Sequence, residues 1–139
     1  MSAQINLIGA NFGNSAFPSA VSYEWNWGYV DPNTLVYHET SQSYESAYWL
    51  LASSPMRSAD FDDYILRSTD SNVSVVLSYF NDSPVDEGDS CVYQTTTDTN
   101  PKSVDPSKGT YFVIRLRCLK STGPALTTDN AMQYYTFSK

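Results

Sequence analysis

The side chains that could carry out catalysis are few and scattered along this chain. His38 is the single histidine, so a metal centre built on several histidines is excluded. Neither a nucleophile elbow nor a phosphate-binding glycine-rich loop occurs in the sequence. A serine, histidine and aspartate triad could still assemble around His38, because triads are defined by geometry rather than by order in the chain. Paired carboxylates could hydrolyse a glycoside, but fifteen acidic residues offer too many pairs to rank. We therefore expect no enzymatic activity.

The densest group of acidic side chains lies between two expected strands, in residues 81–89. Its four carboxylates belong to Asp82, Asp86, Glu87 and Asp89. Calcium prefers such a concentration of oxygen atoms, which makes these residues weak candidates for a metal site. Their spacing differs from that of an EF-hand loop, and a solvated acidic hairpin loop is the ordinary explanation. We expect no bound metal and no cofactor.

Aromatic residues alternate with polar ones between Val21 and Val30. One face of the expected strand would carry Tyr23, Trp25, Trp27 and Tyr29. Four rings on one face would form a flat strip about 20 Å long. If exposed, this strip could stack against sugar rings; if buried, it is a bulky core face. The opposite face is polar and can meet water, which favours the buried interpretation.

The stretch from Gly109 to Ser121 predicts a long central strand with two different faces. Phe112, Ile114, Leu116 and Cys118 make one face entirely apolar. The other face, which we expect to be exposed, carries Tyr111, Arg115 and Arg117. These two arginines are half of the arginines in an acidic chain, and Arg and Tyr are enriched at protein interfaces. This face could dock against an acidic patch on another copy of the chain, or it could simply be solvated.

The remaining segments predict an antiparallel all-β protein. Apolar periodicity indicates short strands over residues 5–8, 21–30, 35–38, 64–68, 73–80, 90–96 and 131–137. Tyr44, Ala47, Tyr48 and Leu51 have helical spacing behind a serine cap, which predicts one short helix over residues 43–53. We expect a single domain over residues 1–139, a β-sandwich or jelly roll of seven or eight strands.

Composition narrows the classes of partner. The net charge is −7 with eight basic residues, which argues against nucleic acid and against an anionic membrane surface. The sequence shows no signal peptide and no apolar run long enough to span a bilayer. We expect a cytoplasmic or virion location, with Cys91 and Cys118 as buried thiols rather than a disulfide.

Three functions remain, in order of preference. The first is a non-catalytic assembly protein of a virus particle, such as a phage capsid decoration or tail protein, with copies of itself and a larger assembly as partners. This preference rests on an analogy of fold class and composition. The second is a carbohydrate-binding module that uses the aromatic strip. The third is a small hydrolase.

Overall fold

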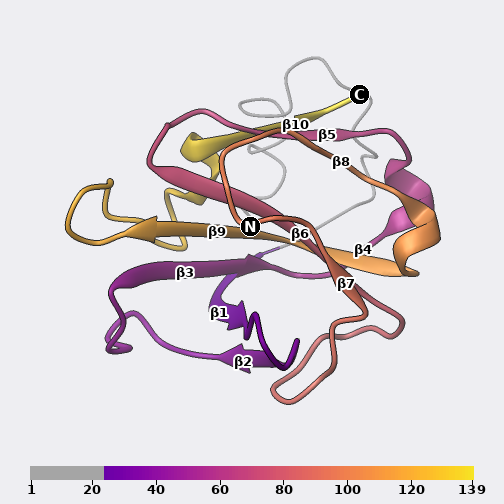
Figure 1. Cartoon of the computed structure of the whole chain (residues 1–139), viewed down its shortest axis with the longest axis horizontal. Coiled ribbons are helices and arrows are strands. Elements are labelled where there is room, and N and C mark those ends of the chain that lie inside the picture. Colours follow the sequence, from indigo (N-terminus) through magenta and orange to yellow (C-terminus); the bar gives the residue numbers. More distant parts are fainter. Residues whose placement is uncertain (1–23) are drawn as a thin grey trace.

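The computed structural model describes residues 24–139, and these form two antiparallel β-sheets (Figure 1). The strand expected over residues 5–8 lies outside the described residues, as does Tyr23. The prediction of a mainly antiparallel, sandwich-like all-β fold is confirmed. The larger sheet has the strand order β2-β1-β3-β9-β6-β7, and β4 also pairs with β9. The smaller sheet has the order β10-β5-β8.

The elements have the following bounds. The strands of the larger sheet are β1 (Trp25–Val30), β2 (Tyr37–Glu39), β3 (Tyr48–Ser53), β4 (Met56–Arg57), β6 (Val73–Phe80), β7 (Tyr93–Gln94) and β9 (Tyr111–Leu119). Those of the smaller sheet are β5 (Ile65–Ser68), β8 (Lys102–Ser103) and β10 (Tyr135–Ser138). Three 3₁₀ turns are η1 (Ser58–Phe61), η2 (Pro106–Lys108) and η3 (Ala131–Tyr134).

Strand β9 is the centre of the larger sheet, as its alternating sequence predicted. Leu116 pairs with Leu51 of β3 on one edge, and Ile114 pairs with Leu77 of β6 on the other. Phe112, Ile114, Leu116 and Cys118 are all buried, so the assignment of the apolar face is confirmed. This face meets the smaller sheet across the main core. The strands β5, β8 and β10 of the smaller sheet lie above β9 in Figure 1.

Aromatic rings fill the main core where the sheets meet. Phe61, from the turn after β4, lies 5.8 Å from Phe112 and 5.5 Å from Phe137, measured between ring centroids. Phe137 also contacts Tyr64, with centroids 5.2 Å apart. Tilted and edge-to-face pairs at these separations stabilise a core beyond the area that they bury. This cluster holds β10 and β5 against β9.

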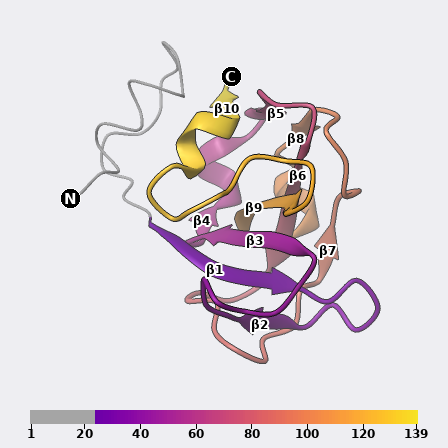
Figure 2. The same cartoon turned by 90° about the vertical axis from the view of Figure 1, so that its left-hand side faces the viewer.

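A second, smaller apolar cluster covers part of the opposite face of the larger sheet. It consists of Val30, Tyr37, Ala52, Phe80, Cys91 and Val113. Strand β2 and the chain leading to β7 lie beneath this face, away from β5 and β10 (Figure 2). Gly28 allows the approach of Tyr37, because a Cβ at position 28 would lie 2.5 Å from the Tyr37 hydroxyl oxygen. The larger sheet is therefore buried on both faces at this end.

The predicted helix over residues 43–53 is wrong, because residues 48–53 form strand β3. Ala52 pairs with Asn26 of β1 and with Arg115 of β9, so β3 bonds on both edges. Its two faces pack against different neighbours, and a strand buried on both faces has a nearly continuous apolar sequence. Such a run does not distinguish helix from strand by periodicity. Residues 24–139 contain no α-helix.

Three other predicted strands are present in the structure, and two of them are clearly shorter than predicted. The hairpin partner of β1 is present as β2, and Asp31 closes the turn by accepting hydrogen bonds from the backbone N–H groups of Asn33 and Thr34 at 2.8 and 3.1 Å. The strand expected over residues 90–96 is reduced to Tyr93–Gln94, and that over 131–137 begins only at Tyr135 after a 3₁₀ turn. Short polar segments of this kind form strands only where a neighbouring edge is available.

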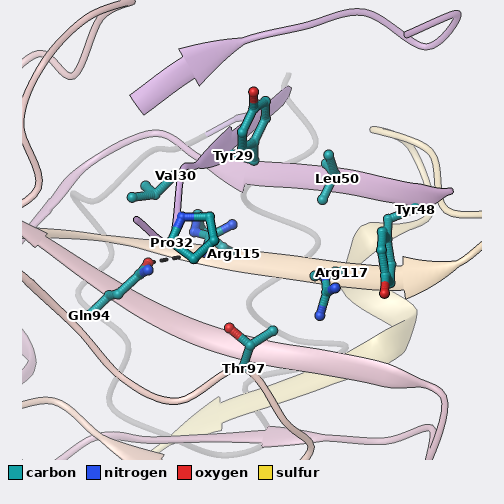
Figure 3. Close-up of a pocket in the computed structure, with 9 residues that line it drawn as sticks. All are labelled: Tyr29, Val30, Pro32, Tyr48, Leu50, Gln94, Thr97, Arg115 and Arg117. Carbon is teal, nitrogen blue, oxygen red and sulfur yellow. Dashed lines mark hydrogen bonds between the residues drawn. The ribbon is translucent and has the colours of Figure 1, made fainter. Parts of the chain in front are cut away.

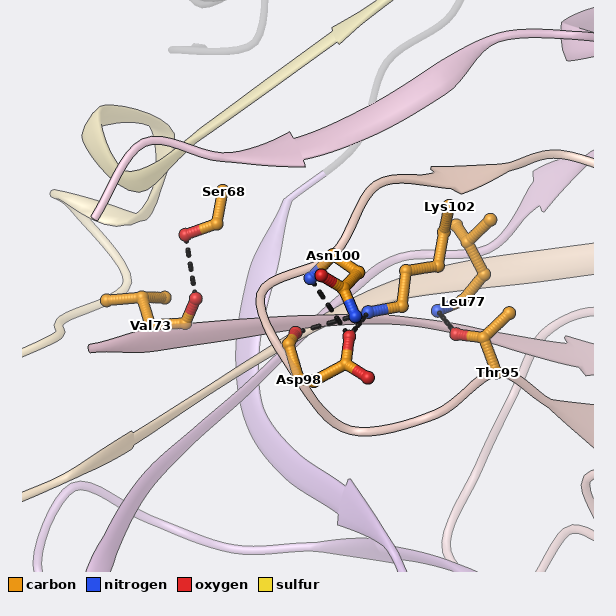
Figure 4. Close-up of polar contacts among 7 residues, drawn as sticks. All are labelled: Ser68, Val73, Leu77, Thr95, Asp98, Asn100 and Lys102. Atoms are coloured by element: carbon orange, nitrogen blue, oxygen red, sulfur yellow. Dashed lines mark hydrogen bonds and ion pairs between the residues drawn. The ribbon is translucent and has the colours of Figure 1, made fainter. Parts of the chain in front are cut away.

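A buried lysine anchors the loop that links the two sheets. The side chain of Lys102 on β8 is only 4% exposed, and its ammonium group pairs with the Asp98 carboxylate and also donates to the Asp98 backbone carbonyl at 3.2 Å (Figure 4). The Asp98 carboxylate also accepts from the Asn100 backbone N–H at 2.9 Å. The pKa of Asp98 is lowered to about 2, mainly by the hydrogen bond from Lys102 and secondly by the one from the Asn100 backbone.

We predict that Asp98→Asn lowers the free energy of unfolding by about 1 kcal/mol at pH 7, a value discounted because the Asp98 side chain is 38% exposed. The carboxylate has a lower pKa in the folded state than in the unfolded state. Its contribution is therefore present above pH 4 and is lost as the pH falls toward about 2. Urea unfolding at several pH values measures this, with exposed Asp62→Asn as the charge-matched control. A stability difference that does not shrink with falling pH would contradict the assignment.

The two cysteines are buried free thiols, as expected. The structure places them on opposite faces of the larger sheet. Cys118 belongs to the main core and Cys91 to the second cluster. Burial raises the pKa of both thiols. Because the thiolate is the reactive form, we predict that a thiol reagent labels neither cysteine in the native protein and both after denaturation. Mass spectrometry of the labelled peptides measures this, and rapid native labelling of Cys118 would show that its strand face is exposed.

Candidate functional site

An open groove of about 290 Å³ lies on the face of the larger sheet that the second cluster leaves uncovered (Figure 3). We call it the arginine groove, and its lining residues are Tyr29, Val30, Pro32, Tyr48, Leu50, Gln94, Thr97, Arg115 and Arg117. They come from β1 and the turn after it, from β3, from β9, and from β7 with the chain just beyond it. β1, β3 and β9 pair side by side, and β7 joins the same sheet through β6, so the sheet fixes the position of the groove.

Arg115 is buried at the groove, with 3% of its surface exposed. Its Nε donates to the Ser78 hydroxyl at 3.0 Å, and its Nη2 donates to the Gln94 side-chain oxygen at 3.1 Å. The Ser78 hydroxyl in turn donates to the same Gln94 oxygen at 3.0 Å. This closed triangle holds the guanidinium in one orientation. It employs two of the five N–H donors of the arginine.

Arg117 lies two residues further along the same strand face. Its guanidinium carbon lies 3.6 Å from the centroid of the Tyr48 ring, a stacking arrangement that leaves the edge of the guanidinium available. Within residues 24–139 the ion pairs are His38 with Glu87 and Lys102 with Asp98, and neither involves Arg115 or Arg117. Residues 1–23 contain no aspartate or glutamate. Two arginines therefore meet at the groove without an acidic side chain of their own chain.

The electrostatics of the groove follow from burial. Desolvation is the main cause that lowers the pKa of Arg115 to about 10, and the positive charge of Arg117 acts in the same direction. The arginine nevertheless stays charged at neutral pH. The hydrogen bond with Tyr44 is the main cause that raises the pKa of Tyr29 to about 12, so this phenol also stays protonated. The groove thus presents positive charge and hydroxyl donors beside apolar side chains.

The predicted interface residues are only partly brought together. Arg115 and Arg117 both line the groove, whereas Tyr111 lies at the far end of β9 and does not. The expectation of an exposed face is wrong for Arg115, because the second cluster, Ser78 and Gln94 cover it. Sequence reasoning missed Tyr48 and Leu50, which were placed on a helix. The uninterrupted apolar run over residues 48–52 gave no periodicity from which their strand face could be read.

The aromatic strip is divided by the fold. Trp25 is buried in the main core, with its ring 5.6 Å from Tyr135 and its indole N–H donating to the sulfur of Met132 at 3.4 Å. Trp27 is half-buried against Trp49. Tyr29 instead reaches the groove. A flat exposed platform of these rings is therefore not formed by the described residues, and the buried interpretation holds for Trp25.

The acidic loop is held by its own hydrogen bonds. One oxygen of Glu87 lies 2.7 Å from Nδ1 of His38, and the other accepts from the Glu39 backbone N–H at 2.7 Å. Asp89 accepts from the Asp86 backbone N–H at 2.7 Å. No group of three potential metal ligands occurs in residues 24–139. The sequence candidates Asp82, Asp86, Glu87 and Asp89 are not gathered around a common point there.

Comparison with models of protein families, with curated proteins and with solved structures found no match. Over the described range, no helix combines the length and the apolar character that crossing a membrane requires.

The different burial of the two tryptophans gives a direct test. We predict that Trp25→Ala lowers the free energy of unfolding by roughly 3–5 kcal/mol, as expected for a large core side chain. Trp27→Ala should cost roughly half as much, because Trp27 stays partly exposed. Denaturant unfolding of both variants measures the difference. Near-native stability of Trp25→Ala would restore the exposed aromatic strip as a ligand platform.

Proposed function

We propose that this protein is a non-catalytic structural subunit whose arginine groove docks against an acidic surface on another copy of the chain. The observation that carries the proposal is the meeting of Arg115 and Arg117 at one groove without any acidic partner from their own chain. Protein interfaces are enriched in arginine and tyrosine, and here both border apolar side chains on paired central strands. A surface built on such strands keeps its shape when it binds.

The acidic loop supplies a complementary surface on the second copy. Asp82, Asp86 and Glu87 are exposed, and the loop lies outside the groove. Contact between two different patches is heterologous, and such contacts build rings or extended arrays. Opposite charges on the two patches orient the encounter and offset part of the general repulsion between two copies of net charge −7.

The class of assembly is proposed as a virus particle, with a capsid decoration or tail protein as the type of component. Its support is the combination of small size, all-β fold and a polar, acidic composition, which is an analogy at the level of the fold. Genes for other virion parts beside this one would strengthen the proposal.

The docking proposal is tested by sedimentation velocity over a range of protein and salt concentrations. Wild type should self-associate, and association should weaken as salt screens the charges. Arg117→Gln should give a folded monomer, since it removes a partly exposed contact without opening a core cavity. Arg67→Gln, which removes an exposed arginine from the smaller sheet, should associate like wild type. A wild-type protein that stays monomeric at millimolar concentration would overturn self-association.

A further inference from the structure

The arginine groove also has the features of a binding site for a small ligand. We propose that it binds an organic monocarboxylate, whose carboxylate group sits between Arg115 and Arg117. This inference goes beyond the proposed function, because it concerns the chemistry of the groove in a single copy of the chain. Binding of the ligand to the monomer is therefore the test of this inference.

The buried arginine is the first support. Arg115 exposes only 3% of its surface, and its hydrogen-bond partners, Ser78 and Gln94, are both neutral. An enclosed charge is costly unless it is paired. Three of its N–H donors have no acceptor among the described residues. An anion in the groove would supply the missing counter-charge. The triangle with Ser78 and Gln94 already holds the guanidinium in place, so little ordering is required on binding.

The lining selects the class of anion. The planar forks of Arg115 and Arg117 match the two oxygens of a carboxylate. Leu50, Val30 and Pro32 provide an apolar surface for the rest of the ligand, and the volume of about 290 Å³ suits a small molecule. Among free small ligands, one with a single negative charge meets less repulsion from the net charge of −7 than one with several.

Benzoate is the probe, and the neutral benzamide of nearly the same shape is its control. Two-dimensional ¹H–¹⁵N NMR of the dilute monomer should show benzoate-dependent shifts at the Arg115 Nε–H and the Gln94 side-chain amide, and no comparable shifts with benzamide. Arg117→Gln should weaken benzoate binding at least roughly tenfold, as expected for loss of a charge-assisted contact. Arg67→Gln should leave binding unchanged. Equal shifts with benzamide, or equal weakening by both substitutions, would overturn the site.

Gln94→Glu provides a second test that does not depend on removing an arginine. The new carboxylate would take the place of the side-chain oxygen that Arg115 already contacts and would serve as an internal counter-ion. The variant should fold and should bind benzoate at least roughly tenfold more weakly than wild type. Wild-type benzoate affinity in folded Gln94→Glu would contradict the role of Arg115.

Sedimentation of wild type with and without saturating benzoate identifies the source of the carboxylate. Release of self-association by benzoate would show that an acidic side chain of a neighbouring copy normally fills the groove. Unchanged association together with NMR binding would identify a free organic acid as the ligand. Loss of the NMR response alone overturns this inference, and absence of self-association alone overturns the docking proposal, so the two failures are distinguishable.

Discussion

The pairing of β9 on both of its edges is the constraint on which the rest of the structure depends. β9 is paired with β3 and β4 along one edge and with β6 along the other, so it is an interior strand and its side chains must be accommodated on two faces. One face is entirely apolar and forms the main core with the smaller sheet. The other face mixes Val113 with two arginines. The groove exists because this second face is covered over only part of its length.

The parts of the fold that could be predicted from the sequence are those in which a single strand carries its own signal. In β6 and β9 one face stays apolar over the whole length of the strand, while the other face carries polar or charged residues at several positions. Both strands and the inward face of Cys118 were therefore predictable. Residues 48–53 lacked that signal, because both faces carry apolar side chains: Leu51 is buried in the main core, and Leu50 is half-buried at the groove. These residues form a strand because they pair with the edges of β1 and β9. For β9, which lies far away in sequence, this long-range pairing overrides the local helical spacing.

The candidate site was predictable in its cations and not in its surroundings. The alternation of β9 is enough to place Arg115 and Arg117 on the same face of the strand. That Ser78 and Gln94 would enclose Arg115 depends on the pairing of β6 with both β9 and β7, and the single short strand pair at β7 carries almost no pattern. The position of the half-buried Tyr48 beside Arg117 could not be predicted either, because it depends on the register of β3 against β9.

Burial of Arg115 makes the groove energetically unusual within this protein. The other enclosed cation, Lys102, has an aspartate beside it, so its charge is balanced inside the fold. Arg115 has no such partner, although acidic residues outnumber basic ones in the chain by fifteen to eight. Hydrophobic residues commonly replace buried charges without loss of stability, so folding alone does not require a guanidinium at this position. The unbalanced charge lies where the sheet opens to solvent, and it is there that an anion from outside the chain can complete the site.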